Sequence, residues 1–137
     1  MTNLFTYGSL MCSDIMTRVA GCHADCIQAT LHNFFRAKIH HEEYPGIVSQ
    51  QNRMVTGVLY FDLSARAIHR LDLFEGEAYN RQEVEVVTKD TRRTTAMTYV
   101  ITPEYRHLLT DREWNYSDFL SAGKKKFEKS YFGFHQF

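Results

Sequence analysis

Two short segments of this sequence carry the residue types needed for acyl-group chemistry on an anionic substrate. The first, Tyr7-Gly8-Ser9-Leu10, closes an apolar run that begins at Leu4. A strand that ends in an aromatic residue, a glycine and a small hydroxyl residue turns sharply and leaves backbone N–H groups unpaired. Such N–H groups bind a carboxylate or a carbonyl oxygen. We therefore predict an oxyanion-binding turn over residues 7–10.

The second segment, LDLFEGEAYNR at residues 71–81, places carboxylates among apolar residues just where a helix would end in glycine. Glu75 follows Phe74 and precedes Gly76, so partial burial against Phe74 would raise its pKa and suit it to proton transfer. From the pattern alone, a solvated glutamate is the favoured interpretation, because glutamates are mostly exposed. Asp72 and Glu77 are the rival carboxylates.

Tyr79 and Arg81 lie on the strand that leaves this glutamate, and alternation would put them on one face. Tyr79 is a candidate for the wall of a pocket. Arg81 has two interpretations of equal weight. It would bind a substrate carboxylate or orient an acidic side chain, or it would form a surface ion pair with Asp72 or Glu83.

Together these segments resemble one family, the gamma-glutamylcyclotransferase-like proteins, in their small prokaryotic, AIG2-like branch. That branch carries a Tyr-Gly-Ser/Thr-Leu turn, a Leu-Asp-x-Phe-Glu-Gly-x-x-Tyr-x-Arg segment, and an aromatic-Arg pair followed by Tyr-Pro-Gly. The last of these corresponds here to Phe35-Arg36 and Tyr44-Pro45-Gly46. The resemblance covers about the first hundred residues. It implies that Glu75 is the catalytic acid/base, and it adds Arg36 and Tyr44 as pocket residues on family position alone.

The resemblance also implies a reaction. Such enzymes release 5-oxoproline from a γ-glutamyl amide or peptide when the substrate's own α-amino group attacks its γ-carbonyl, with no cofactor. Ser9 is not expected to act as a nucleophile, because no histidine or lysine stands at a spacing that marks it as activated. The alternative is a non-catalytic module that binds a small ligand on the same fold, since fold does not imply function.

Composition narrows the class of protein. The chain has 137 residues, with 16 basic and 16 acidic side chains, and we expect one domain over its whole length. The zero net charge gives no support to nucleic-acid binding, and no apolar run is long enough to span a membrane. The sequence shows no charged n-region followed by an apolar h-region, and three cysteines fit reduced thiols. We therefore expect a cytoplasmic protein that acts on a small molecule.

No metal site is expected from the spacing of potential ligands. Cys22-His23 and Cys26 have no second ligand pair at a zinc-like distance. The cluster His40-His41-Glu42-Glu43 is dense, but successive residues of an extended chain point to alternate sides. Aromatic residues also gather in the tail, where packing over a core is favoured over a protein-interaction role. They are Phe127, Tyr131, Phe132, Phe134 and Phe137.

The elements that must position these residues follow from periodicity and from capping signals. Strands are predicted over residues 4–7, 26–35 with a continuation to 40, 55–61 with a bulge or close approach at Gly57, 81–88 and 94–101. Helices are predicted over residues 13–21, over 63–74 with Ser64 as the cap, after Thr102, and over 117–130. Many strands with few helices predict an α+β fold with a small mixed sheet, open or closed. The family resemblance implies a closed, mixed β-barrel flanked by helices.

Overall fold

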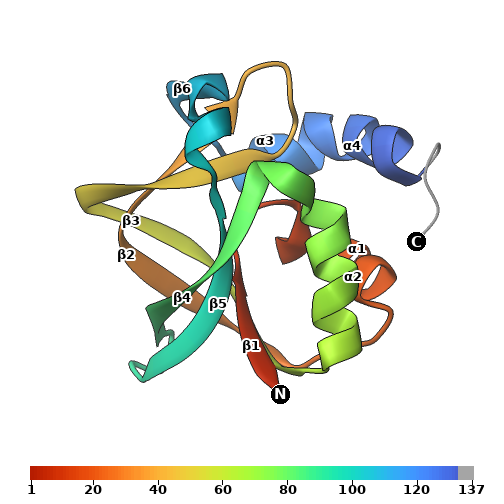
Figure 1. Cartoon of the computed structure of the whole chain (residues 1–137), viewed down its shortest axis with the longest axis vertical. Helices are drawn as coiled ribbons and strands as arrows, with labels where there is room; N and C mark the ends of the chain where they lie inside the picture. Colours follow the sequence, from red (N-terminus) through yellow and green to blue (C-terminus); the bar gives the residue numbers. More distant parts are fainter. Residues whose placement is uncertain (133–137) are drawn as a thin grey trace.

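Five strands form a closed, mixed β-barrel in the computed structural model, which describes the backbone of residues 1–132 and the side chains of residues 1–130 (Figure 1). The barrel order is β3-β1-β5-β4-β2, and pairing of β2 with β3 closes it. β1 and β5 run parallel, and the other neighbours are antiparallel. The bounds are β1 Thr2–Thr6, β2 Cys26–Ile39, β3 Pro45–Leu63, β4 Tyr79–Thr88 and β5 Arg93–Ile101. The predicted α+β barrel with flanking helices is confirmed.

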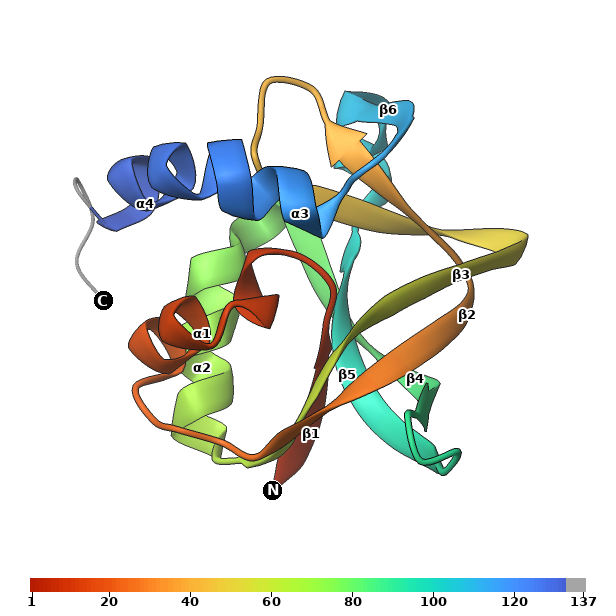
Figure 2. The same cartoon turned by 180° about the vertical axis from the view of Figure 1, so that it is seen from behind.

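Two helices cover one side of the barrel, and a chain of short helices lies across one end (Figures 1 and 2). The side helices are α1, Ser13–Ala20, and α2, Ala65–Glu75. Short 3₁₀ helices cover Ser9–Met11, Gly76–Ala78 and Pro103–Leu108, and a sixth strand, β6 Leu109–Glu113, pairs with β2. The end is covered by α3, Tyr116–Asp118, a π-helical turn Phe119–Gly123, and α4, Lys124–Phe132.

α2 forms where the capping signals predict it. The Ser64 side chain accepts a hydrogen bond from the N–H of Ala67 at 3.1 Å, which satisfies one of the free donors at the helix start. The helix ends at Gly76, whose φ of +74° favours glycine. Phe74 is buried and Leu73 is 65% exposed, so Phe74 completes the apolar face. This ending leaves Glu75 at the last position of the helix.

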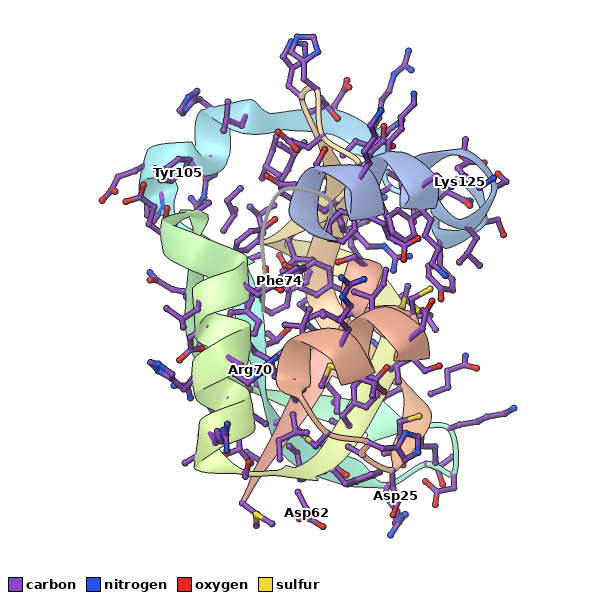
Figure 3. The ribbon with its side chains drawn as sticks, turned by 90° about the vertical axis from the view of Figure 1, so that its right-hand side faces the viewer. Asp25, Asp62, Arg70, Phe74, Tyr105 and Lys125 are labelled. Carbon is purple, nitrogen blue, oxygen red and sulfur yellow. The ribbon has the colours of Figure 1, made fainter. Side chains whose placement is uncertain are left out.

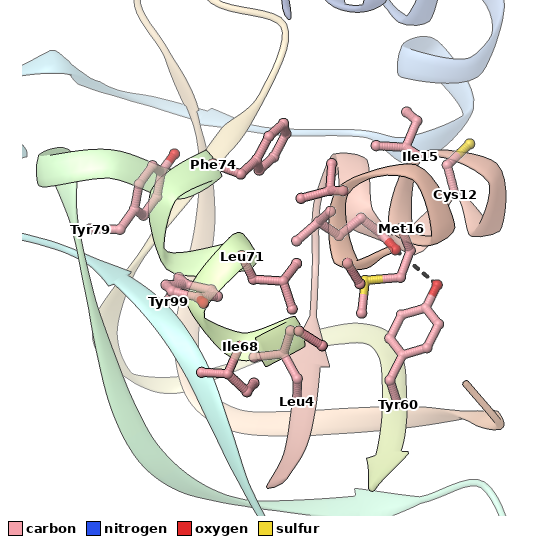
Figure 4. Packing of buried hydrophobic residues seen from close by; sticks show 14 of the residues in the cluster. Leu4, Cys12, Ile15, Met16, Tyr60, Ile68, Leu71, Phe74, Tyr79 and Tyr99 are labelled. Atoms are coloured by element: carbon pink, nitrogen blue, oxygen red, sulfur yellow. Dashed lines mark hydrogen bonds between the residues drawn. The ribbon is translucent and has the colours of Figure 1, made fainter. Parts of the chain in front are cut away.

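Strand alternation divides the core into two layers. Leu4 points outward toward α1 and α2, while Phe5 points into the barrel, because successive side chains of a strand face opposite sides. Figure 4 shows Leu71 and Ile68 of α2 packed in the outer layer, where the hydroxyl of Tyr60 donates to the carbonyl of Leu10 at 2.9 Å. This bond ties β3 to the turn that follows β1.

Gly57 is a close-approach point, as predicted. A Cβ atom there would lie 2.1 Å from the carbonyl oxygen of Thr6 and 2.8 Å from the Phe5 ring. β3 thus passes against β1 more tightly than any side chain would allow. The contact fixes the end of β1, from which the turn at residues 7–10 starts.

The predicted elements differ from the structure in β3 and in the tail, and β6 was not predicted. β3 begins at Pro45 rather than at Val55, because its residues 49–54 are exposed where they pair with β2 and lack apolar alternation. The predicted tail helix is interrupted by the π-helical turn, which shifts the register of side chains. Phe119 and Phe127 are therefore buried, whereas Leu120, which uninterrupted α-helical spacing would place on the same face as Phe127, is 46% exposed. The aromatic side chains of the tail from Tyr131 onward, which were expected to pack over a core, lie outside the described residues.

Candidate active site

A small cavity, open to solvent at its mouth, lies where β1 ends against the last turn of α2. Its lining combines the end of β1, the start of β3, the end of α2 and one residue of α4. Seven of the nine residues predicted for the site line it: Tyr7, Gly8, Ser9, Leu10, Tyr44, Glu75 and Tyr79. The fold thus brings together the two segments that the sequence singles out.

Glu75 contributes its carboxyl group to this cavity from the C-terminal end of α2. The side chain is half-buried, and the loss of water around it raises its pKa to about 8. The negative charge of Asp72, one turn earlier on the same helix, adds to this shift. A carboxyl group with such a pKa exchanges protons readily near neutral pH.

Asp72 is held by three hydrogen bonds from side chains. Arg81 donates to it through Nε at 3.0 Å and through its terminal nitrogen at 3.2 Å, and the hydroxyl of Tyr99 donates at 2.7 Å. The phenol of Tyr99 is buried, and burial together with this bond raises its pKa well above the usual value. Asp72 is therefore a fixed neighbour of Glu75, supported by two strands of the barrel.

The turn after β1 also lines the cavity. Strand β1 ends at Thr6, and the 3₁₀ helix starts at Ser9. Within the described residues, no acceptor is assigned to the N–H of Ser9 or of Leu10. Gly8 is required by space, because a Cβ atom there would lie 2.7 Å from Cδ of Pro45. The turn can therefore present backbone donors to the cavity, as its sequence predicts.

Two tyrosine hydroxyl groups connect segments that line the cavity. The hydroxyl of Tyr79 donates to the carbonyl of Pro45 at 2.7 Å, and the hydroxyl of Tyr7 donates to the carbonyl of Tyr99. Both rings are buried, and burial, followed by the charge of Glu75, raises the pKa of the Tyr7 phenol. Figure 4 shows Tyr79 and Phe74 at the end of α2, with Tyr99 beside them.

Two predicted pocket residues, Arg36 and Arg81, are not among the residues that line the cavity. Arg81 forms the ion pair with Asp72, which was one of its two interpretations. Arg36 donates from one terminal nitrogen to the carbonyls of Tyr7 and Thr56, at 2.9 and 3.0 Å, and lies over the Trp114 ring. Its partial burial lowers its pKa. Arg36 thus lies outside the cavity and donates a hydrogen bond to the backbone where the turn begins.

Sequence reasoning missed seven residues that line this cavity: Phe5, Thr6, Pro45, Phe74, Ala78, Tyr99 and Phe127. Pro45 was visible in the Tyr-Pro-Gly segment, but nothing in the pattern of β5 marks Tyr99 as a partner of Asp72. Among residues 1–132, no three histidine, cysteine, aspartate or glutamate side chains converge on a possible metal site. The helices described here are all too short or too polar to cross a membrane.

Comparison with known proteins assigns the family. The family model described as "Gamma-glutamyl cyclotransferase, AIG2-like" matches residues 4–116. The chain belongs to this family. The matched residues include the turn at residues 7–10 and Glu75, whereas α4 lies beyond the matched region.

Relatives of this AIG2-like chain include plant proteins. Protein AIG2 C of Arabidopsis thaliana is 28% identical over 130 residues, which cover 94% of this chain and 78% of that protein. AIG2-like protein D of the same plant is 32% identical over 90 residues, covering 66% of this chain and 59% of that protein. These relatives give no support to the prokaryotic branch suggested by the sequence motifs.

Solved structures share the fold of this family member. An Arabidopsis thaliana protein solved in solution is 28% identical, with a TM-score of 0.71, and the match covers 94% of this chain and 78% of that one. A structure named gamma-glutamyl cyclotransferase is 20% identical, with a TM-score of 0.65, and the match covers 76% of this chain and 73% of that one. At 20% identity, the likeness to this second structure shows the fold alone.

Proposed function

We propose that this protein is a cofactor-independent gamma-glutamylcyclotransferase that releases 5-oxoproline from a γ-glutamyl amide or peptide. The observation that carries the proposal is that Glu75, with a pKa of about 8, and the turn at residues 7–10 line one cavity. The family match gives this pair of features its chemical meaning. We also expect the protein to work in the cytoplasm, where the thiols of Cys12, Cys22 and Cys26 would stay reduced.

The reaction joins two atoms of one substrate molecule. The α-amino nitrogen attacks the γ-carbonyl carbon, the bond from that carbon to the leaving nitrogen breaks, and a five-membered lactam ring closes. Because the nucleophile is tethered, the enzyme gains most from folding the substrate into an attacking geometry. The cavity at the end of β1 would impose that geometry on the glutamyl group.

Glu75 would move the protons that this reaction requires. The α-ammonium group loses two protons when its nitrogen becomes the lactam N–H, and the leaving nitrogen gains two protons when it departs as an ammonium group. The ionised form of Glu75 accepts each proton and its protonated form returns it to the leaving nitrogen, so the balance needs no water and no external acid. The raised pKa suits both steps, because both forms of the carboxyl group are populated near neutral pH. The N–H groups of Ser9 and Leu10 would bind the oxygen that becomes negative during attack.

The test is an assay of 5-oxoproline release from a panel of γ-glutamyl amides, with the wild type and Glu75→Gln measured side by side. We expect release by the wild type and a loss of about 10²-fold or more in the variant. Glu77→Gln is the matched control, because Glu77 is an exposed glutamate on the 3₁₀ helix that follows. An unchanged rate in Glu75→Gln would remove Glu75 from the mechanism.

Silence of the folded wild type across the whole panel would contradict the proposed reaction. The protein would then be better described as a non-catalytic module that binds a small ligand on the same fold. It would show thermal stabilisation by a γ-glutamyl ligand that survives Glu75→Gln.

A further inference from the structure

Three aromatic rings from three separate segments meet beside Glu75. The ring centroid of Phe127, on α4, lies 6.0 Å from that of Phe74 and 6.3 Å from that of Tyr44, both in edge-on arrangements. All three side chains also line the cavity. Figure 3 shows Phe74 at the upper end of α2, beneath the C-terminal helices. The cavity therefore has an aromatic end, which we call the aromatic wall, next to its acid/base.

The position of the aromatic wall relates it to one part of the substrate. Phe74 precedes Glu75 in the chain, and the turn at residues 7–10 lines the same cavity. If the turn holds the glutamyl oxygens and Glu75 protonates the leaving nitrogen, the substituent on that nitrogen lies against the aromatic wall. Apolar rings stabilise an apolar substituent by removing its surface from water.

α4 is fixed where it starts, so Phe127 is held at a defined place. The ammonium of Lys124 lies 2.8 Å from a carboxylate oxygen of Asp14 on α1. At the preceding residue, Gly123, a Cβ atom would lie 2.5 Å from a carboxylate oxygen of Glu43, so the backbone approaches that loop closely. The Phe127 ring itself packs on Phe119 at 5.8 Å and is only 3% exposed.

We propose that the aromatic wall is a subsite for an aryl or other apolar substituent on the leaving amine, and that Phe127 sets this preference. The inference rests on the proposed function and adds the substrate class. Because α4 lies outside residues 4–116, the residue that sets the preference comes from a segment that the family model does not match.

The experiment compares two substrates, γ-glutamyl-phenethylamide and γ-glutamyl-methylamide, in the wild type and in Phe127→Ala. The wild type should prefer the phenethylamide in kcat/KM by tenfold or more. Phe127→Ala should lose about tenfold on the phenethylamide and change less than threefold on the methylamide, since only the larger substituent reaches the aromatic wall. A ratio of the two substrates that stays unchanged in Phe127→Ala would overturn the proposal.

Two further variants keep the result interpretable. Phe127→Leu retains an apolar side chain for packing and should give an intermediate ratio. Leu120→Ala is the control on the neighbouring turn, because Leu120 is 46% exposed and does not line the cavity. Thermal melts of each variant show whether the fold is retained. A change of ratio in Leu120→Ala equal to that in Phe127→Ala would overturn the role assigned to Phe127.

Binding separates this proposal from the proposed reaction. Calorimetric titration of both amides into Glu75→Gln and into Glu75→Gln/Phe127→Ala reports the preference without turnover. Tighter binding of the phenethylamide that depends on Phe127, together with a wild type that releases no 5-oxoproline, would support the subsite and refute the reaction. Equal binding of the two amides by Glu75→Gln would refute the subsite, whatever the assay of the reaction gives.

Discussion

Asp72 and Glu75 lie one turn apart at the end of α2, and the charge of the first raises the pKa of the second. Burial is the larger cause of this shift, and the charge of Asp72 adds to it. Asp72 itself is kept in place by Arg81 and Tyr99. The barrel thus controls a proton-transfer group on a helix through a neighbouring carboxylate.

The first prediction concerns pH. If Glu75 acts as a base in its ionised form, kcat/KM should rise with pH and level off above about 8, where the carboxyl group has lost its proton. Asp72→Asn removes the neighbouring charge and should move the midpoint of this rise to lower pH, by up to about one unit. The measurement is a pH–rate profile for 5-oxoproline release by both proteins.

Glu77→Gln serves as the control for this shift, because Glu77 is exposed and is not a cause of the raised pKa of Glu75. It should leave the midpoint unchanged. Coincident profiles for the wild type and Asp72→Asn would show that Asp72 does not act on the titrating group.

The second prediction concerns stability. The folded-state pKa of Glu75 lies above the ordinary value of 4.5, so the folded protein holds this proton more tightly than the unfolded chain. Ionisation of Glu75 should therefore reduce the free energy of unfolding as pH rises from about 4.5 to 8. Glu75→Gln removes this ionisation and therefore its cost to the free energy of unfolding. Each unit by which the folded-state pKa exceeds the ordinary value corresponds to about 1.4 kcal/mol of that cost.

Melting temperatures at two pH values test this directly. At pH 8 the variant should melt higher than the wild type, by about 2–4 °C for each kcal/mol. At pH 4.5 the difference should shrink, because the wild-type carboxyl group is then protonated in the folded state. A variant that is less stable at pH 8 by the same margin as at pH 4.5 would contradict a raised pKa.

The third prediction concerns the turn. Gly8→Ala places a methyl group against the Pro45 ring, where a Cβ atom would be 2.7 Å from Cδ, so the turn must shift. We expect a loss of about 1–3 kcal/mol in stability and a large loss of 5-oxoproline release. Ser9→Ala keeps every backbone N–H and should retain activity within about threefold. Loss of all activity in a folded Ser9→Ala would instead assign the hydroxyl a direct role.

The fourth prediction distinguishes the two interpretations of Arg81. The structure pairs this side chain with Asp72 at 3.0 Å, with the two side chains 35% and 39% exposed. Such partly exposed pairs contribute about 0.2–1 kcal/mol, so Arg81→Gln should be a mild change in stability with KM within about threefold of the wild type. A tenfold rise in KM without loss of stability would show that Arg81 binds a substrate carboxylate.

Local sequence signals determined much of this protein. The Ser64 cap and Gly76 define α2, so the place of Glu75 at its end is encoded within a short segment. The Tyr7-Gly8-Ser9-Leu10 motif likewise predicts a sharp turn, and the structure has one. These features depend on capping and on backbone conformation, which act over a few residues.

Tertiary structure alone decided the rest. Closure of the barrel brings the β1 turn to the end of α2, β5 supplies Tyr99 to Asp72, and the π-helical turn buries Phe119 rather than Leu120 beside Phe127. Arg36, expected in the pocket, instead reaches the carbonyl of Tyr7 from β2, a strand that does not pair with β1. Each of these contacts joins residues far apart in the chain, so it depends on how strands pair and helices pack, and no local pattern encodes it.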